Sequence, residues 1–101
     1  MKILAIEKDI ENEKWGNSDN ILKQEAKKVY QLYLSGSLRE VYFSENKNAV
    51  LILEAENKQM AEKLLSSLPL VKENMIQFEI IELRPYTGYE RLMENYDRHS
   101  L

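Results

Sequence analysis

The 101 residues contain no cysteine, one histidine, three glycines and two prolines. The absence of cysteine excludes disulfides, thiolate nucleophiles, zinc ribbons and iron–sulfur ligation, and it fits a reducing compartment. Catalytic metal sites usually take several imidazole or thiolate ligands, but the chain offers only His99, two residues from its end. We therefore expect no metal site. The isolated glycines give no phosphate-binding loop, so we also expect no cofactor.

Long apolar runs are absent too. No run approaches the roughly 20 residues that cross a membrane, and the first residues turn to charge too early for a signal peptide. The formal net charge is -3, and the basic residues are scattered among acids, which disfavours a nucleic-acid partner. We expect one cytoplasmic domain over residues 1–101 that binds neither nucleic acid nor membrane.

Hydrophobic periodicity predicts the order strand, helix, strand, strand, helix, strand. Two right-handed crossovers in this order give a ferredoxin-like α+β fold, a four-stranded antiparallel sheet with both helices on one face. The expected strands cover residues 2–8, 37–43, 49–55 and 75–83, and the expected helices cover about 19–34 and 57–68. The first helix is expected to bury one stripe, formed by Leu22, Ala26, Val29, Tyr30 and Tyr33.

Helix boundaries also carry sequence signals. Gly36 is expected to end the first helix, Asn57 to cap the start of the second, and Pro69 to stop the second.

The third strand is apolar on both faces. Val50 and Ile52 alternate with Leu51 and Leu53, although the helices can cover only one face of the sheet. We expect the two leucines to face the helices, and Val50 and Ile52 to face a cavity closed by a second copy of the chain. The partner is therefore this chain itself, in a homodimer or a larger homo-oligomer.

The fourth strand and the segment after Pro85 follow the same logic. Ile76, Phe78 and Ile80 suit the helix side, which leaves Gln77, Glu79 and Ile81 on the other face. After Pro85, apolar residues recur at helical spacing and predict a helical extension that packs on the partner or on the rim of the cavity; they are Tyr89, Leu92, Met93 and Tyr96. Trp15, in a polar segment, is a candidate lid or interface anchor.

Several segments resemble the muconolactone isomerase family of dimeric α+β barrel proteins. The matching pieces run through most of the chain: Met1-Lys-Ile-Leu-Ala-Ile, Leu32-Tyr-Leu-Ser-Gly-Ser-Leu-Arg-Glu, Ala49-Val-Leu-Ile-Leu-Glu, Leu68-Pro-Leu-Val and Phe78-Glu. The resemblance implies a ferredoxin-like dimeric barrel and a cofactor-free isomerase that shifts a double bond in an unsaturated lactone by moving a proton. Leu38, Glu40 and Tyr42 stand where the isomerases are expected to carry Trp and His, which indicates a separate branch.

The candidate catalytic residues are Glu40, Tyr42 and Glu79. Alternation counted from Leu38 places Glu40 and Tyr42 on one face of the second strand, and parity places Glu79 on the mixed face of the fourth. A carboxylate facing an apolar cavity has its pKa raised towards the range of a general base, and a tyrosine can polarise a carbonyl oxygen. The alternative interpretation is that Glu40 lies in water near its strand end, that Glu79 pairs with a Lys or Arg of the partner, and that Tyr42 only packs.

The candidate substrate-binding residues are Glu54, Ile52, Arg84 and Tyr86. Arg84, beside Tyr86 at a cavity mouth, could hold a substrate carboxylate, or form an ordinary salt bridge. Glu54 could equally lie in water at its strand end. Arg39 has the opposite parity to Glu40 and is expected to be structural unless a bulge intervenes.

These residues favour a small-molecule-binding protein, with the lactone isomerase as the leading hypothesis for an enzyme. Two alternatives stay open. One is a non-catalytic binding or assembly module whose second face is a filled dimer interface. The other is a cofactor-independent monooxygenase of the same superfold.

Overall fold

The computed structural model describes residues 1–10 and 19–93. Its elements, in chain order, are β1 (Lys2–Asp9), α1 (Asp19–Leu34), β2 (Leu38–Phe43), β3 (Ala49–Glu54), α2 (Lys58–Ser66), α3 (Pro69–Lys72), β4 (Ile76–Glu82) and α4 (Glu90–Met93). Three residues discussed above, Trp15, Tyr96 and His99, lie outside the described residues.

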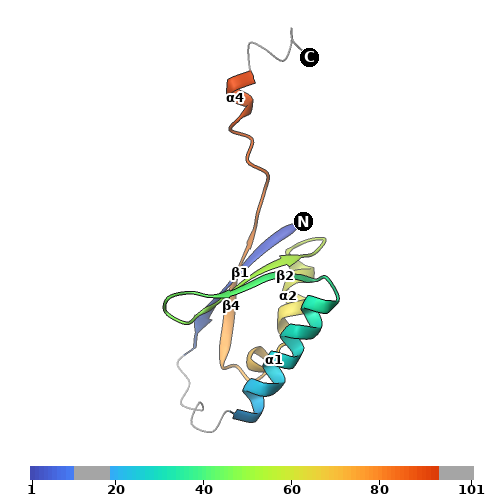
Figure 1. Ribbon diagram of the computed structural model, residues 1–101, viewed down its shortest axis with the longest axis vertical. Coiled ribbons are helices and arrows are strands. Elements are labelled where there is room, and N and C mark those ends of the chain that lie inside the picture. Colours follow the sequence, from blue (N-terminus) through green and yellow to red (C-terminus); the bar gives the residue numbers. More distant parts are fainter. Residues whose placement is uncertain (11–18, 94–101) are drawn as a thin grey trace.

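The four strands form one antiparallel sheet in the order β2-β3-β1-β4. The helices α1 and α2 lie on the same side of this sheet (Figure 1). Each helix connects two strands that have a third strand between them, so the topology is the split βαβ arrangement. The predicted ferredoxin-like α+β fold is confirmed.

The face predicted for each strand residue is also confirmed in β3 and β4. Leu51 and Leu53 are buried beneath the helices, and their partners across β1 are Ala5 and Ile3. Val50 and Ile52 point to the opposite side, which no element of the described chain covers. We call this side the open face.

One prediction about β2 is wrong. Counting alternation from Leu38 put Leu38, Glu40 and Tyr42 on one face, but the register shifts between Leu38 and Glu40. Leu38 is therefore buried in the core, whereas Glu40 and Tyr42 lie beside Ile52 and Val50 on the open face. A bulge adds one residue to a strand and so reverses the parity beyond it.

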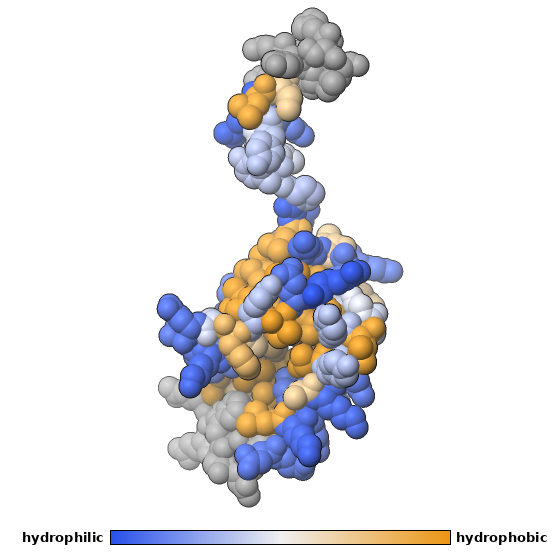
Figure 2. Space-filling model, in the orientation of Figure 1, coloured by the Kyte–Doolittle hydropathy of each residue, from blue (hydrophilic) through white to orange (hydrophobic). Residues whose placement is uncertain are grey.

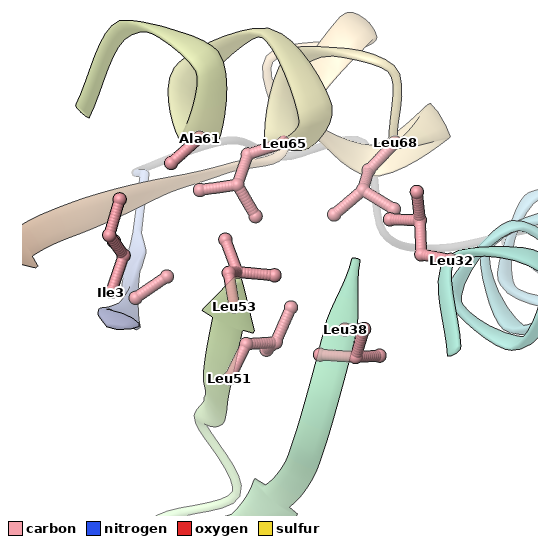
Figure 3. Close-up of a cluster of buried hydrophobic side chains, with 9 residues drawn as sticks. Ile3, Leu32, Leu38, Leu51, Leu53, Ala61, Leu65 and Leu68 are labelled. Atoms are coloured by element: carbon pink, nitrogen blue, oxygen red, sulfur yellow. The ribbon is translucent and has the colours of Figure 1, made fainter. Parts of the chain in front are cut away.

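The core lies between the sheet and α2 (Figure 3). Ile3, Leu51 and Leu53 point up from the strands, and side chains of α2 and its C-terminal end point down to meet them. The helix side consists of Ala61, Leu65 and Leu68, with Leu32 of α1 closing the cluster laterally. A second small cluster of Leu70, Met75 and Ile76 continues it under α3.

The residues predicted to start and to stop α2, Asn57 and Pro69, both lie at the ends of that helix. The Asn57 side chain accepts a hydrogen bond from the Met60 N–H at 2.9 Å, which confirms the predicted N-cap. Pro69 does more than stop α2, because it occupies the first turn of the short helix α3. Proline suits that position, since its missing N–H would have no partner inside the helix.

Most of the stripe predicted to be buried on α1 is not packed into the core. Val29 packs against the edge of the core, but Leu22, Tyr30 and Tyr33 are exposed, and Leu32, outside the stripe, is the buried residue of this helix. The helix therefore stands partly away from the sheet, and the space beneath it forms the cavity described below.

Residues 83–93, which we call the arm, leave the domain after β4 and project away from it (Figures 1 and 2). The Cα radius of gyration is 18.1 Å, above the roughly 13 Å of a compact chain of this length. The expected packing of this segment on a partner, or on the rim of the cavity that a partner closes, stays a prediction. Among the described residues, no helix combines the length and apolarity that a bilayer crossing requires.

The core position of Leu53 gives a direct test of this packing. Leu53 has no exposed surface, so Leu53→Ala should lower the free energy of unfolding by about 2–5 kcal/mol through lost burial and the cavity left behind. Met60→Ala, on the exposed side of α2, should cost less than about 1 kcal/mol. Urea denaturation of the two variants measures the contrast, and equal effects would show that the core is placed wrongly.

Candidate functional site

A cavity of about 660 Å³ lies between α1 and the helix-side face of the sheet. Its walls come from α1, from β1 to β4 and from the region of α3, and most of them are aliphatic or aromatic. The lining residues include Leu22, Ala26 and Val29 of α1, facing Leu38, Val41, Ala49 and Leu51 of the sheet. Its volume lies in the range of pockets that hold small organic molecules.

The mouth of the cavity is apolar as well. Tyr30 and Tyr33 of α1 and Phe43 of the edge strand β2 line it and are largely exposed. Figure 2 shows apolar surface gathered in the middle of the globular part. Lys47, in the turn between β2 and β3, is the basic residue of the lining, and its backbone has a φ of 66°, in the left-handed region.

Glu7 is one of two carboxyl groups in this apolar lining. Its Oε1 atom accepts a hydrogen bond from the Ala49 N–H at 2.9 Å, just beyond the last paired residues of β1 and β3. Desolvation by burial raises the pKa of Glu7, the Ala49 N–H opposes that rise, and nearby Asp9 adds to it. The carboxyl group therefore holds a proton more readily than an exposed glutamate.

Glu25 is the second carboxyl group, and it approaches from α1. Its Oε1 atom accepts a hydrogen bond from the Leu70 N–H at 3.0 Å, which ties α1 to the start of α3. Burial is the largest cause that raises the pKa of Glu25; the Leu70 N–H lowers it, and the charge of Glu7 raises it further. The charge of Glu7 is the smallest of these three causes.

Two carboxyl groups with raised pKa values can divide the roles of acid and base. Burial is the largest cause of the raised pKa in each group, so each holds a proton more readily than an exposed glutamate. The ionised member can remove a proton from a bound molecule, and the protonated member can donate one. Each keeps an oxygen on a backbone N–H, which fixes its orientation.

The predicted catalytic residues lie on the open face, across the sheet from this cavity. Register places Tyr42, Val50, Ile6 and Glu79 at one level, and Glu40, Ile52, Leu4 and Ile81 at the next. The Tyr42 hydroxyl donates to the Glu40 carboxylate at 2.7 Å, and this bond raises the pKa of Tyr42. Glu40, Tyr42 and Glu79 therefore share a face, as predicted, with an apolar strip between the two glutamates.

The predicted substrate-binding residues are dispersed. Ile52 is at the centre of the open face, but Glu54 pairs with the N-terminal ammonium group at 2.7 Å, which, with weaker help from Arg39, lowers the pKa of Glu54. Arg84 pairs with Glu82 at 3.1 Å, and Tyr86 belongs to the arm. None of these residues lines the cavity.

Sequence reasoning missed Glu7 and Glu25, although the sequence contains a signal for each. Glu7 has the same parity as Ile3 and Ala5, which places an acid on the inward face of β1. Glu25 lies three residues after Leu22 and four before Val29, inside the apolar stripe of α1. An acid that interrupts an inward-facing stripe indicates either a buried partner or a cavity, and here it marks a cavity.

Comparison with known proteins supports the fold. No family model matches the chain, and no curated protein matches it. A solved structure that is similar to it is 5-chloro-2-hydroxyhydroquinone dehydrochlorinase from Burkholderia phenoliruptrix AC1100, in complex with 2,5-dihydroxybenzoquinone, with a TM-score of 0.59 and 15% sequence identity. The match covers 87% of this chain and 98% of the dehydrochlorinase, and it shows a shared fold.

The raised pKa values of the two cavity glutamates predict a distinctive pH dependence of stability. A carboxyl group with a raised folded-state pKa stabilises the fold below its unfolded pKa, and that contribution is lost as the pH rises through the folded pKa. Glu25→Gln keeps an acceptor for the Leu70 N–H but removes the charge. The free energy of unfolding of Glu25→Gln, minus that of the native chain, should therefore be largest at pH 7. This difference should decline as the pH falls towards about 4.3, where the native Glu25 is increasingly protonated in both states.

Urea denaturation of both proteins at several pH values measures this difference. Glu62→Gln, on α2 and exposed, is the matched control and should show no such trend. A pH-independent difference for Glu25→Gln would mean that the Glu25 carboxyl group is not desolvated in the folded chain.

Proposed function

We propose that the chain binds a small unsaturated or aromatic molecule in the cavity and moves a proton on it without a cofactor. The observation that carries this proposal is the pair of half-buried carboxyl groups, Glu7 and Glu25, in an otherwise largely apolar cavity. The dehydrochlorinase of similar fold holds an oxygenated six-membered ring in its solved complex, and this ligand class supports the proposal.

The chemistry follows from the two protonation states. The ionised carboxylate takes a proton from a carbon made acidic by a conjugated carbonyl group, and the electrons move into the conjugated system. The protonated carboxyl group returns a proton at another atom of that system, so the net change is a shifted double bond. The unsaturated lactone suggested by the sequence resemblance is one substrate of this class.

A second candidate site is the open face, where Tyr42 donates to Glu40 beside an apolar strip. In this alternative, Glu40 or Glu79 is the base and Tyr42 polarises the substrate, as the sequence predicts. Ile52 and Arg84 would then help to hold the substrate together with Glu54 and Tyr86. The non-catalytic module and the oxygen-dependent monooxygenase remain the alternatives to proton transfer.

Variants of the two sites separate these proposals. Glu7→Gln and Glu25→Gln should each lower proton exchange on a responding lactone or hydroxyquinone by about 10²–10⁴-fold, because a carboxyl group in proton transfer contributes an effect of that size. Ala26→Trp should block binding by filling the cavity. Deuterium incorporation measured by NMR in D₂O, together with ligand titration, reads both effects.

The exposed Glu62→Gln variant is the control for this experiment. Unchanged exchange in Glu7→Gln and Glu25→Gln, with loss in Glu40→Gln or Glu79→Gln, would move the site to the open face. Oxygen consumption with hydroquinones would instead favour the monooxygenase, and binding without exchange would favour the non-catalytic module.

We also propose that the open face is covered by a second copy of the chain. Its centre consists of Leu4, Ile6, Val50 and Ile52, and Ile81 at its edge is 37% exposed. Charged residues of both signs surround this centre, with Lys2 and Lys8 on β1 and glutamates on the other strands. An apolar centre with a charged rim is the usual organisation of a protein–protein interface.

Light scattering tests the self-association directly. The native chain should be a dimer at micromolar concentration, and Leu4→Glu should weaken the dimer by about 30-fold or more, because it places a charge at the apolar centre. Lys58→Glu, on α2 and exposed, is the control and should leave the dimer intact. A native chain that stays monomeric would contradict this proposal without affecting the cavity.

A further inference from the structure

The arm has an ordered local structure, held by packing and hydrogen bonds between its own residues. The rings of Tyr86 and Tyr89 pack edge to face, with centroids 5.0 Å apart and an interplanar angle of 86°. The helical turn of α4 follows at once, through bonds from the Glu90 N–H to the Thr87 carbonyl and from the Leu92 N–H to the Tyr89 carbonyl, both 3.0 Å. The arm thus presents an ordered aromatic and aliphatic surface.

Gly88 makes this arrangement possible. A Cβ atom at Gly88 would overlap the phenol ring of Tyr86, so that ring packs directly against the glycine backbone. The Gly88 φ angle is outside the left-handed region, so backbone conformation does not require glycine here. Glycine is required because any side chain at this position would collide with the Tyr86 ring. The tyrosine pair depends on this close approach.

The apolar surface of the arm has no cover within its own chain. Tyr86 is 74% exposed, Leu92 is 72% exposed and Tyr89 is 66% exposed. Three large side chains exposed together on a projecting segment indicate an interaction site.

The arm also begins on β4, an edge strand, whereas α1 leads into β2 at the other edge of the same sheet.

The register of the open face indicates where the arm meets a second copy. Two sheets packed face to face can be related by a two-fold axis parallel to the strands, which places β4 of one copy over β2 of the other. Tyr42 then faces Glu79 of the partner subunit, and Glu54 lies near Lys2 of the partner subunit. An axis across the strands would instead bring Lys2 near Lys8 of the partner subunit, and like charges disfavour it.

The favoured axis brings the base of the arm to the end of the partner's α1. The Leu83 N–H bonds to the Lys2 carbonyl at 2.9 Å, so the arm leaves at the sheet end where β2 begins. At that end the C-terminal half of α1 exposes Tyr30, Tyr33 and Leu34. Two of these residues, Tyr30 and Tyr33, also line the cavity.

We infer that the arm is exchanged between two copies of the chain, with its tyrosine pair and Leu92 packed on the C-terminal half of the partner's α1, beside the mouth of the cavity. This inference rests on the proposed self-association through the open face. The exposed apolar residues of the arm and those of α1 cover each other in this arrangement. The arm of each copy then extends the wall of the other copy's cavity.

The absence of native cysteine allows a clean cross-linking experiment. Chains carrying Leu92→Cys are mixed with chains carrying Tyr33→Cys, and the mixture is treated with a short bismaleimide. A covalent dimer should be the main linked product of the mixture, and neither chain alone should give it in comparable yield. Glu62→Cys, on α2 and exposed, replaces Tyr33→Cys as the control and should not link.

The outcomes of these experiments distinguish the exchange of the arm from the proposed open-face dimer and from the proposed function of the cavity. A dimer by light scattering that gives no covalent product overturns the position of the arm and leaves the open-face dimer standing. A Leu92→Cys, Tyr33→Cys double variant that links within one chain at high dilution shows that the arm folds back, and it overturns the exchange. A monomeric native chain overturns both the open-face dimer and the exchange of the arm. Ligand titration of the cavity tests the proposed function independently of either.

A substitution at Gly88 tests the built arm in the full-length chain. Gly88→Ala should displace the Tyr86 ring and weaken self-association by roughly fivefold or more. The pair formed by Tyr86 and Tyr89 would then have to be ordered during association, and that ordering costs free energy. Thr87→Ala, one residue earlier, is the matched control and should not weaken it. Equal association constants for the native chain and Gly88→Ala would overturn the role of the preformed tyrosine pair.

Discussion

The structure depends on one constraint: a four-stranded sheet has two faces, and this chain places its helices on only one of them. The helix side contains the fully buried core, built on Ile3, Leu51 and Leu53. The open face carries a strip of similar hydrophobicity, because each central strand has apolar residues at both parities. Leaving such a strip in water forfeits about 25 cal/mol per Å² of apolar area, so its composition is best explained by a partner.

The same constraint shapes the cavity. With one helical layer and a small core, α1 contacts α3 and the edge strand β2, whereas α2 and α3 contact β4 at the other edge. Leu32 anchors the C-terminal half of α1, and the bond from the Leu70 N–H to Glu25 ties its N-terminal half to α3. Between these two anchors, Val29 packs against the edge of the core and also lines the cavity. The cavity thus exists because polar and apolar anchors fix the helix without filling the space beneath it.

Much of this fold could be predicted from the sequence, because alternation and helical spacing report directly on which side chains face inward. The faces of Val50, Leu51 and Ile52 follow from parity alone, as do those of Phe78 and Glu79. The bulge after Leu38 could not be predicted, since an inserted residue leaves no periodic signal. The cavity was missed for another reason. A stripe such as Leu22, Val29 and Tyr33 looks the same whether it packs on a sheet or lines a space beside it.

The two carboxyl groups identify which of these interpretations of α1 is correct. In a filled core, Glu7 and Glu25 would each lose hydration without gain, and a single backbone N–H offsets only part of that cost. In a cavity that admits water or a ligand, the remaining carboxylate oxygen can still be satisfied. The partial burial of two acids in so small a protein therefore supports the proposal of an occupant with polar groups of its own. The proposals also divide the molecule by function: the helix side of the sheet would supply the chemistry, while the open face and the arm would supply the assembly.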